Sequence, residues 1–231
     1  MIVVTGGTKG IGRAIVEKFA SMGFTVVTCS RTKSQLVTIN SEIESKYKTN
    51  LHYLEVDLSE KRDIEMFVNF IRSLDEPVEA LINNAGFYIG GQLYSEDEGI
   101  LEEMMKTNVY SAYYLTRGLV EDMIARKAGH IFNICSVAST KIFPNGGSYS
   151  VSKFALYGMT KLFREELKEY NIKVTAILPG ATFTSSWDEN EIDPDRIIKP
   201  TDVAEAIFAA FSLSPNAVVE EMVIRPQLGD L

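Results

Sequence analysis

The sequence of 231 residues contains only two cysteines, two histidines and one tryptophan. The cysteines, Cys29 and Cys135, are too few for a disulfide framework in a chain of this length, and each lies in an apolar run typical of a buried strand. We therefore expect two reduced thiols in the core and a protein of a reducing compartment, the cytoplasm.

Long hydrophobic runs and a surplus of basic residues are missing as well. The opening stretch MIVVTGG is too short for a signal peptide, and no later run approaches the roughly 18 apolar residues of a membrane-spanning helix. The net charge is −8, whereas a surface for nucleic acid or an anionic membrane needs a basic footprint. We expect a soluble protein with neither partner, and we predict no metal site.

Short β-branched runs alternate with longer amphipathic segments from end to end. The predicted strands are 2–5, 24–30, 51–56, 79–83, 130–136, 173–178 and a last one within 218–226, and a helical stretch is predicted from about Glu96 to Arg126. Near-continuous apolar runs such as VVTCS are typical of parallel strands buried on both faces. Strands that alternate with helices form βαβ units. The sequence therefore predicts one α/β domain over residues 1–231, a three-layer doubly wound Rossmann fold whose sheet of about seven strands is mostly or wholly parallel.

One segment does not follow this alternation. Residues 180–200, GATFTSSWDENEIDPDRIIKP, have weak periodicity and are too many for an ordinary connection. Segments of this length in compact domains are usually lids or binding loops, with a disordered insertion as the alternative. We predict a substrate lid over about 180–200.

The first predicted strand runs directly into TGGTKGIG, residues 5–12, which opens a helix. In this position glycines serve a tight turn, close approach of the backbone to a pyrophosphate and close packing of helix on strand. The helix N-terminus adds free N–H groups and the positive end of its dipole. A glycine cluster alone is a weak signal, but its place between strand and helix predicts a dinucleotide site at Gly6, Gly10 and Gly12.

The end of the second predicted strand distinguishes the two nicotinamide dinucleotides. An NAD site usually has an acidic residue there for the adenosine ribose, but this strand ends Cys29-Ser30-Arg31-Thr32. The guanidinium of Arg31 suits a 2′-phosphate, and Lys9 in the glycine turn adds a second positive charge. Both residues could instead be solvated loop cations. We predict NADP(H) as the cofactor.

Further motifs follow in order along the chain. They are LEVDLS with Asp57, NNAG at 83–86, KTNVYSAYYLTR with Asn108, FNICSVAS with Ser136, YSVSK with Tyr149 and Lys153, and PGATFT at 179–184. Together with the glycine turn, they make the chain resemble the short-chain dehydrogenase/reductase family from residue 2 to about 184. The resemblance implies an NADP-dependent enzyme that transfers a hydride between the nicotinamide C4 and a carbonyl or alcohol carbon.

The pattern Tyr-x-x-x-Lys occurs twice, as Tyr149 with Lys153 and as Tyr157 with Lys161. The family pattern also requires a serine 13 positions before the tyrosine, at the end of the fifth strand; counting back from Tyr149 gives Ser136, whereas the second pair gives a proline. Residues eight apart on a helix have drifted by about 80°, so the two pairs point in different directions. We interpret Tyr157 as a packing residue and Lys161 as a surface charge.

The resemblance assigns a catalytic role to four residues. Tyr149 would be the general acid in reduction and the general base in oxidation. The ammonium of Lys153 would favour the phenolate and hold the nicotinamide ribose hydroxyls. Ser136 would hydrogen-bond the substrate carbonyl oxygen and polarise it. Asn108 would hold a water in the relay that reprotonates the tyrosine.

The resemblance also implies the cofactor contacts. Asp57 would lie near the adenine amino group, Asn83 and Gly86 near the adenosine ribose, and Thr184 near the nicotinamide carboxamide. Asp57 and Asn83 could instead be strand-end caps. The full predicted set is Thr5, Gly6, Thr8, Lys9, Gly10, Ile11, Gly12, Ser30, Arg31, Asp57, Leu58, Asn83, Asn84, Ala85, Gly86, Tyr149, Lys153, Pro179, Gly180, Thr182 and Thr184.

Substrate identity depends on residues outside these motifs. Around the predicted pocket, Tyr88, Phe143, Trp187 and Ile192 are apolar or aromatic, and the predicted lid is acidic. A hydrophobic ketone, diketone or aldehyde is the expected substrate. The alternatives are a 3-oxoacyl thioester and, in a different class, a non-catalytic NADPH-binding sensor.

The end of the chain, EEMVIRPQLGDL, departs from one branch of the family. Members that reduce 3-oxoacyl carrier-protein thioesters commonly finish with an Asp-Gly-Gly tail that joins subunit packing. The sepiapterin-reductase-like and general carbonyl-reductase branches resemble this chain at least as well. The family implies a homodimer or homotetramer that packs through helices at about 109–126 and 150–170. The aromatic run 110–114 fits such an interface or the core.

Overall fold

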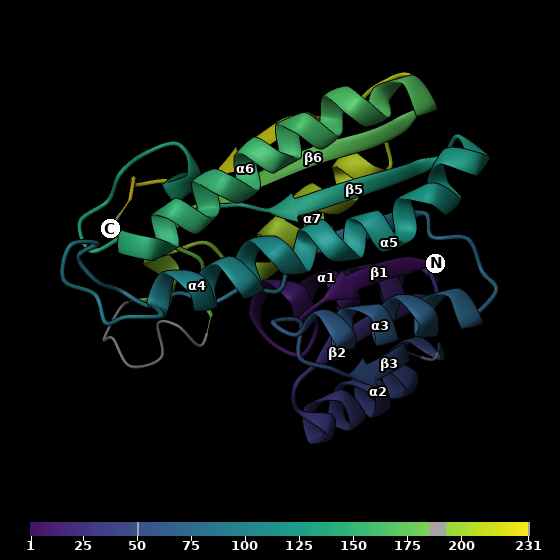
Figure 1. The fold of residues 1–231 in the computed structure, drawn as a ribbon. Coiled ribbons are helices and arrows are strands. Elements are labelled where there is room, and N and C mark those ends of the chain that lie inside the picture. The colour runs from purple at the N-terminus through teal and green to yellow at the C-terminus, as the bar shows by residue number, and fades with distance from the viewer. Residues whose placement is uncertain (50, 185–192, 231) are drawn as a thin grey trace.

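Seven parallel strands form one sheet at the centre of the molecule (Figure 1). The computed structural model describes residues 1–49, 51–184 and 193–230. The order of the strands in the sheet is β3-β2-β1-β4-β5-β6-β7, and every neighbouring pair is parallel. The predicted Rossmann fold is confirmed, with a wholly parallel sheet. The strands are β1 (Ile2–Thr5), β2 (Val26–Ser30), β3 (Leu51–Glu55), β4 (Ala80–Asn83), β5 (Gly129–Ile134), β6 (Ile172–Pro179) and β7 (Glu221–Ile224).

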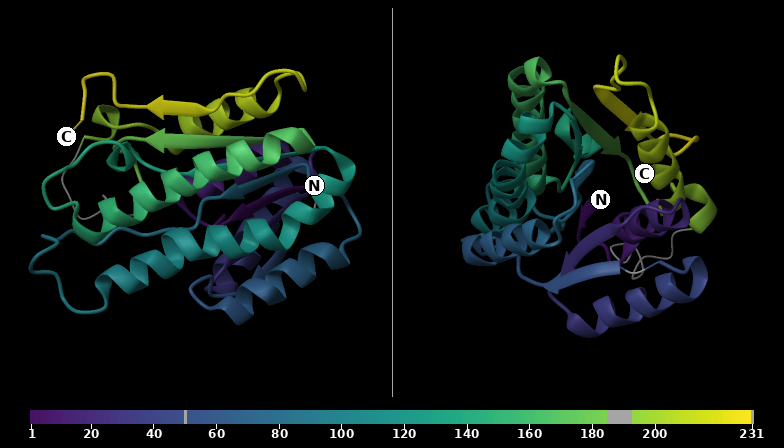
Figure 2. Two further views of the ribbon diagram at one scale, coloured as in Figure 1. Left: turned by 45° about the horizontal axis from the view of Figure 1, so that its top comes forward. Right: turned by 90° about the vertical axis from the view of Figure 1, so that its right-hand side faces the viewer.

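Helices cover both faces of this sheet (Figure 2). Side chains alternate along each strand, so Ile2 and Val4 of β1 enter the core on one face and Val3 enters the core on the other. Because both faces are buried at the centre of the sheet, the central strands β1 and β4 are mostly apolar, whereas the edge strands β3 and β7 include exposed residues. Among the described residues, no helix is both long enough and apolar enough to cross a membrane. One face carries α1 (Gly10–Ser21), α2 (Lys33–Tyr47) and α7 (Pro200–Phe211), and the other carries α3 (Lys61–Ser73), α5 (Ser111–Arg126) and α6 (Gly147–Leu167).

The helix predicted over 96–126 is interrupted in the structure. It consists of α4 (Ile100–Met105), a π-helical turn at Lys106–Tyr110 and then α5. Gly99 precedes α4 with a φ of 94°, in the left-handed region that favours glycine. The helix therefore begins only after it, at Ile100. The π turn contains Asn108, which is buried. Turns of this kind inside helices are frequent at functional sites.

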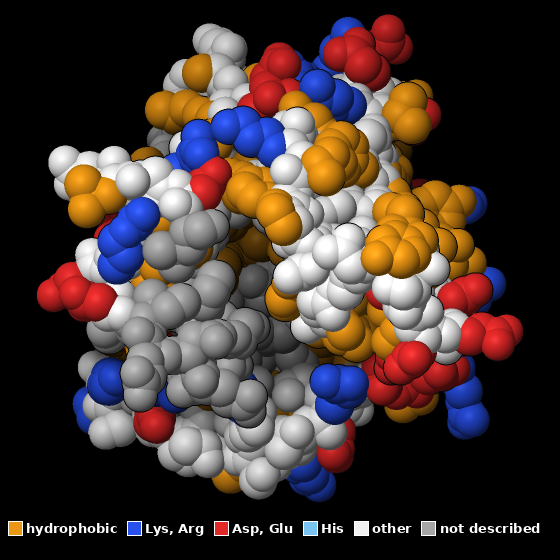
Figure 3. All heavy atoms as spheres, turned by 90° about the vertical axis from the view of Figure 1, so that its left-hand side faces the viewer, with side chains coloured by type: hydrophobic (Ala, Val, Ile, Leu, Met, Phe, Trp, Pro, Cys, Tyr) orange, Lys and Arg blue, Asp and Glu red, His pale blue; other side chains and the backbone are white. Residues whose placement is uncertain are grey.

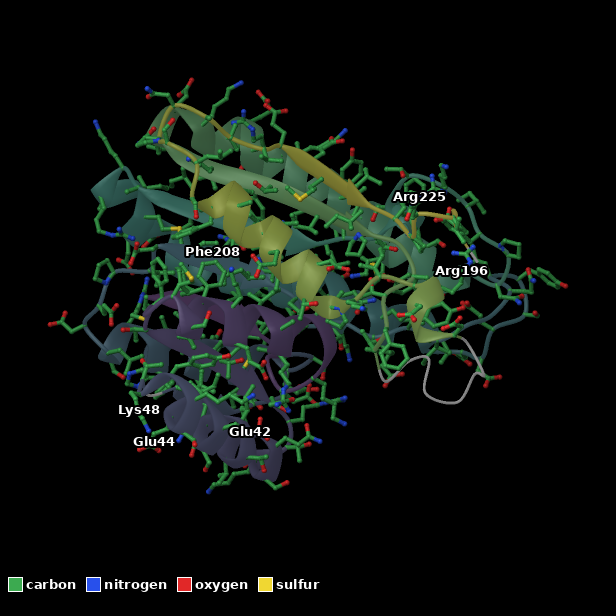
Figure 4. The ribbon with its side chains drawn as sticks, turned by 180° about the vertical axis from the view of Figure 1, so that it is seen from behind. Glu42, Glu44, Lys48, Arg196, Phe208 and Arg225 are labelled. Carbon is green, nitrogen blue, oxygen red and sulfur yellow. The ribbon has the colours of Figure 1, made fainter. Side chains whose placement is uncertain are left out.

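The chain after β7 is held by two arginines, which lie close together in Figure 4. The guanidinium of Arg196 donates to the carbonyl oxygen of Gly229 at 3.0 Å, and more weakly to those of Leu228 and Asp230. Arg225 forms an ion pair with the Asp230 carboxylate. The segment after β7 is therefore tied down within the chain itself.

All seven strands end at the same edge of the sheet, on the left in Figure 1. The chain moves outward from β1 through β2 to β3 and then continues on the other side of β1 with β4. In open α/β sheets, ligands bind outside the carboxyl ends of the strands at such a switch point. Figure 3 looks onto this edge, where hydrophobic side chains gather next to Lys and Arg side chains.

His130 on β5 is a titratable group inside the sheet. Its side chain is buried, and its Nε2 lies 2.7 Å from Thr175 Oγ1. Burial, together with the charge of Lys173, lowers the pKa of His130 from 6.5 to about 3. Between these two values the unfolded chain binds a proton that the folded chain does not, so this group makes the folded state less stable as the pH falls.

We expect the free energy of unfolding to fall more steeply with decreasing pH in the wild type than in His130→Gln. The difference should develop below pH ~6.5, at up to about 1.4 kcal/mol per pH unit for one proton. Urea unfolding of both proteins at neutral and mildly acidic pH measures it. Parallel pH dependences of the two proteins would show that His130 does not titrate on unfolding.

Candidate functional site

The glycine turn between β1 and α1 has the backbone that its sequence predicts. Gly6 and Gly10 have φ values of 67° and 51°, in the left-handed region. A Cβ at Gly12 would lie 2.3 Å from the carbonyl oxygen of Gly6, so only glycine fits there. α1 begins without a side-chain cap from Lys9 and without an acidic residue in its first turn. Its first N–H groups and its dipole are therefore available to an anionic ligand.

The loops after β1 and β4 are tied together at the switch point. Thr5 Oγ1 accepts hydrogen bonds from the backbone N–H groups of Asn84 at 2.9 Å and Ala85 at 2.8 Å. In return, Asn84 Nδ2 donates to the carbonyl oxygen of Thr5 at 2.8 Å. These bonds hold the NNAG motif against the glycine turn.

Asn83 lies differently from its neighbour Asn84. Its side chain is buried, and Nδ2 donates to Thr116 Oγ1 at 3.1 Å and to Asn133 Oδ1 at 2.8 Å. The amide thus joins β4 to α5 and β5 inside the protein. A contact between Asn83 and the adenosine ribose would have to come from its backbone.

The end of β2 brings small polar groups next to two exposed cations. Thr8 Oγ1 donates to Gln35 Oε1 at 3.2 Å and lies 3.4 Å from Ser30 Oγ. Arg31 and Lys9 are exposed, and within 1–49, 51–184 and 193–230 neither forms an ion pair. Sequence reasoning missed Gln35, because only the fold brings the first turn of α2 to the glycine turn.

Asp57 follows β3 and acts locally as a cap. Its Oδ1 accepts hydrogen bonds from the backbone N–H of Ser59 at 2.9 Å and from the Ser59 hydroxyl at 2.8 Å. Asp57 therefore acts as a strand-end cap, the second of the two roles that the sequence leaves open. Among the described residues, no hydrogen bond to its other carboxylate oxygen, Oδ2, is present. Leu58 is buried in the core formed with α3 and α5.

The PGATFT motif reaches the glycine turn from β6. Pro179 is the last residue of β6, and Thr182 Oγ1 donates to the carbonyl oxygen of Gly180 at 2.9 Å. A Cβ at Gly10 would lie 3.0 Å from Thr184 Cγ2. The glycine turn and the segment after β6, which are far apart in the sequence, are thus adjacent in the fold.

Tyr149 and Lys153 lie one turn apart on α6, and Lys153 Nζ is 5.7 Å from the centroid of the Tyr149 ring. Lys153 is only 5% exposed and donates to the carbonyl oxygen of Ile134, at the end of β5, at 2.8 Å. Ser136 follows β5, and its Oγ accepts a hydrogen bond from the backbone N–H of Ala138 at 3.1 Å. The hydroxyl proton of Ser136 and the other two protons of the ammonium remain available to ligands.

Asn108 connects the loop after β4 to α6. Its Oδ1 accepts from the backbone N–H of Phe87 at 3.0 Å, and its Nδ2 donates to the carbonyl oxygen of Phe87 at 3.1 Å and to Ser152 Oγ at 3.0 Å. A Cβ at Gly86 would lie 3.0 Å from Asn108 Oδ1 and 3.6 Å from Lys153 Nζ, so the three residues are adjacent. Both the oxygen and the nitrogen of the Asn108 side-chain amide are thus engaged by protein groups.

The second Tyr-x-x-x-Lys pair lies elsewhere, as predicted. Tyr157 packs against the cluster around Val109 and Leu156. Lys161 Nζ lies 4.4 Å from the Tyr157 ring centroid and 3.2 Å from Glu221 Oε1, at the edge strand β7. Tyr157 is a packing residue and Lys161 a surface charge.

Comparison with known proteins agrees with this arrangement. A family profile described as "short chain dehydrogenase" matches residues 1–195. The chain belongs to the short-chain dehydrogenase/reductase family. It is an oxidoreductase of that family, which uses a nicotinamide dinucleotide.

Individual members of the family resemble the whole chain. Sepiapterin reductase from Chlorobaculum tepidum is 30% identical over 239 residues, which cover 100% of this chain and 98% of that protein. Farnesol dehydrogenase from Aedes aegypti is 31% identical over 231 residues, 97% of this chain and 94% of that protein. The crystal structure of a metagenomic short-chain oxidoreductase in complex with NADP superimposes with a TM-score of 0.86 at 28% identity, covering 98% of this chain and 97% of that one.

Residues 185–192 of the predicted substrate lid, which include Trp187, the acidic stretch Asp188 to Glu191 and Ile192, lie outside the described residues. The predicted site residues from the glycine turn to Thr184 all lie at the carboxyl edge of the sheet or directly behind it.

Proposed function

We propose that this protein is an NADPH-dependent reductase that converts a ketone, diketone or aldehyde to an alcohol, with Tyr149 as the general acid. The observation that carries the proposal is the placement of Tyr149 one turn before the buried Lys153 on α6, a helix that packs against the turn Val137–Ser139 directly after Ser136. The sheet brings this group to the same edge as the glycine turn. A hydride donor and a proton donor can therefore act on one carbonyl group.

The glycine turn fits the pyrophosphate of a dinucleotide, since Gly6 and Gly10 have a left-handed backbone and α1 begins with no side-chain cap. Arg31 and Lys9 would bind the 2′-phosphate together with Thr8 and Ser30. Lys153 would hold the nicotinamide ribose. When bound, the nicotinamide supplies the hydride. The other proposed contacts are those of Thr5, Gly6, Gly10, Ile11, Asp57, Leu58, Asn83, Asn84, Ala85, Gly86, Tyr149, Pro179, Gly180, Thr182 and Thr184.

The protein side of the reaction is a proton transfer. Tyr149 donates the proton, and the Lys153 ammonium lies 5.7 Å from the centroid of its ring. The Ser136 hydroxyl donates to the carbonyl oxygen of the substrate and stabilises the charge that develops there. Asn108 holds the loop after β4 against α6 and so keeps the surroundings of Lys153 in place.

The proposed substrate is hydrophobic. Tyr88, which is 49% exposed, packs edge-on against the Tyr149 ring at 5.0 Å between centroids. The relatives described above are named for a pterin and for an isoprenoid alcohol, although they are almost equally similar to this chain. The alternative substrate is a 3-oxoacyl thioester.

We further propose that two copies of the chain pair through the outer face of α6. Val151, Phe154 and Leu162 are 37%, 41% and 64% exposed and lie on the side of the helix opposite Tyr149. A Cβ at Gly158, between them, would meet no atom within 4 Å. Val151 and Phe154 also line a groove of about 720 Å³. An exposed apolar stripe of this kind is typical of a subunit interface.

Light scattering at micromolar concentration should give twice or four times the mass of the 25.7 kDa chain. Phe154→Glu, which places a charge in the stripe, should shift the protein toward the mass of one chain. A wild-type protein with the mass of a single chain would contradict this interface.

Tyr149→Phe should lower kcat for carbonyl reduction by about 10²- to 10⁴-fold, the usual contribution of a general acid. NADPH affinity should change by less than about twofold, because the phenol ring is kept. Tyr157→Phe is the matched control in the second motif and should leave kcat unchanged. Substantial turnover by Tyr149→Phe would refute the role of Tyr149.

Arg31→Asp should weaken NADPH binding by at least about tenfold, the effect of losing a charge-assisted hydrogen bond, and should strengthen NADH binding. Arg62→Asp on α3, an exposed arginine away from the glycine turn, controls for the change in net charge. Fluorescence titration with both dinucleotides measures the ratio. Unchanged NADPH affinity in Arg31→Asp would exclude the proposed 2′-phosphate contact.

A further inference from the structure

The first turn of α6, which carries Tyr149, is capped by a residue from a distant loop. α6 begins after Gly146 with neither a side-chain cap of its own nor an acidic residue in its first turn. Instead, Glu96 Oε1 accepts a hydrogen bond from the backbone N–H of Ser148 at 2.9 Å, and Glu96 Oε2 accepts one from the Ser148 hydroxyl. A carboxylate in this position satisfies a free N–H group and interacts favourably with the helix dipole.

The neighbouring backbone leaves room for this carboxylate. A Cβ at Gly147 would lie 1.7 Å from Glu96 Oε1, and a Cβ at Gly91 would lie 2.7 Å from Glu96 Cγ. Ser148 is only 1% exposed, so water is poorly placed to replace Glu96. Loss of the carboxylate would leave two buried donors of Ser148 without a partner, which costs more than the net value of the bonds.

Other contacts join the same two loops. The backbone N–H of Gly91 donates to the carbonyl oxygen of Asn145 at 3.0 Å, and Gln92 Nε2 donates to Asn145 Oδ1 at 2.7 Å. The Tyr88 hydroxyl also donates to the Asn145 carbonyl oxygen, at 3.2 Å, while the Tyr88 ring packs against Tyr149. The loop after β4 therefore contacts both the start of α6 and the ring of the proposed general acid.

We propose that Glu96 is a positioning residue for Tyr149, acting through Ser148. By holding the first turn of α6, it fixes the phenol hydroxyl at the place where the substrate carbonyl binds. This inference rests on the proposed function, because it gives Glu96 a part in the reaction of Tyr149. Displacement of a reacting group by about 1 Å can cost on the order of 10²-fold in rate, so a contact on the adjacent residue is sufficient.

Three variants test the proposal by steady-state kinetics with NADPH and an aromatic 1,2-diketone. Glu96→Ala should lower kcat by at least about tenfold. Glu96→Gln should retain part of that activity, because its carbonyl oxygen can still accept from the Ser148 N–H. Glu98→Gln is the control in the same loop. The carboxylate of Glu98 is exposed and has no side-chain partner among the described residues, so this variant should behave as the wild type. NADPH affinity should stay within about twofold in all three, because Lys153 is held by the carbonyl oxygen of Ile134, and Asn84 and Ala85 are held by Thr5, independently of Glu96.

Hydrogen exchange without substrate tests the contact separately. Amides in 145–152 should exchange faster in Glu96→Ala than in the wild type, while the rest of α6 remains protected. Unchanged exchange there, or an unchanged kcat, would overturn the inference. Parallel losses of kcat, NADPH affinity and thermal stability would also overturn it, because they indicate a general structural role. A wild-type protein that reduces no carbonyl would instead contradict the proposed function, and the exchange result would still decide whether Glu96 holds the helix.

Discussion

The hydrogen bonds of Thr5 hold together the two halves of the site. Its hydroxyl oxygen accepts from two successive backbone N–H groups after β4, and its carbonyl oxygen accepts from the Asn84 side chain. These bonds join β1 to β4, the strands between which the order of the sheet reverses. The proposed cofactor side of the site, on the β1 and β2 loops, is thereby placed against the proposed catalytic side, on the β4 and β5 loops and α6.

The catalytic side depends on how α6 is held. Lys153 is tied to the end of β5, and Ser152 to Asn108 in the π turn. Glu96 supplies the cap that the first turn lacks. α6 is thus held by the end of β5, by Asn108 of the π turn and, at its N-terminus, by Glu96 of the loop after β4. The proposed general acid, Tyr149, would keep one orientation toward the substrate when held in this way, as rate acceleration by positioning requires.

Much of this could be predicted from the sequence, because the signals are local. Parallel strands buried on both faces show as apolar runs, and all seven strands were predicted within a few residues of their observed ends. Cys29 and Cys135 are free and buried, as expected. The glycine turn and the choice of Tyr149 over Tyr157 also depend on short-range patterns or on fixed spacing.

The remaining features depend on contacts between distant segments. Nothing near Glu96 distinguishes it from the acidic residues around it, and the helix predicted from this residue begins only at Ile100 because Gly99 has a left-handed backbone. Gln35 reaches the glycine turn only through the packing of α2. The resemblance implies a contact of Asn83 with the ribose, with a strand-end cap as the alternative; only the folded structure shows that its side chain bonds to Thr116 and Asn133 inside the protein.

The central claim is that the carboxyl edge of the sheet brings a hydride donor and Tyr149 to one carbonyl group. The most direct measurement is the consumption of NADPH by the purified protein, followed by its near-ultraviolet absorbance. The substrates to test are aromatic diketones, sepiapterin, simple aldehydes and an acetoacetyl thioester, with NADH in parallel. We predict that at least one hydrophobic carbonyl compound is reduced to its alcohol in stoichiometric amount with NADPH, and more slowly with NADH. Tight NADPH binding without reduction of any of these compounds would contradict the account and favour a protein that binds the cofactor without catalysis.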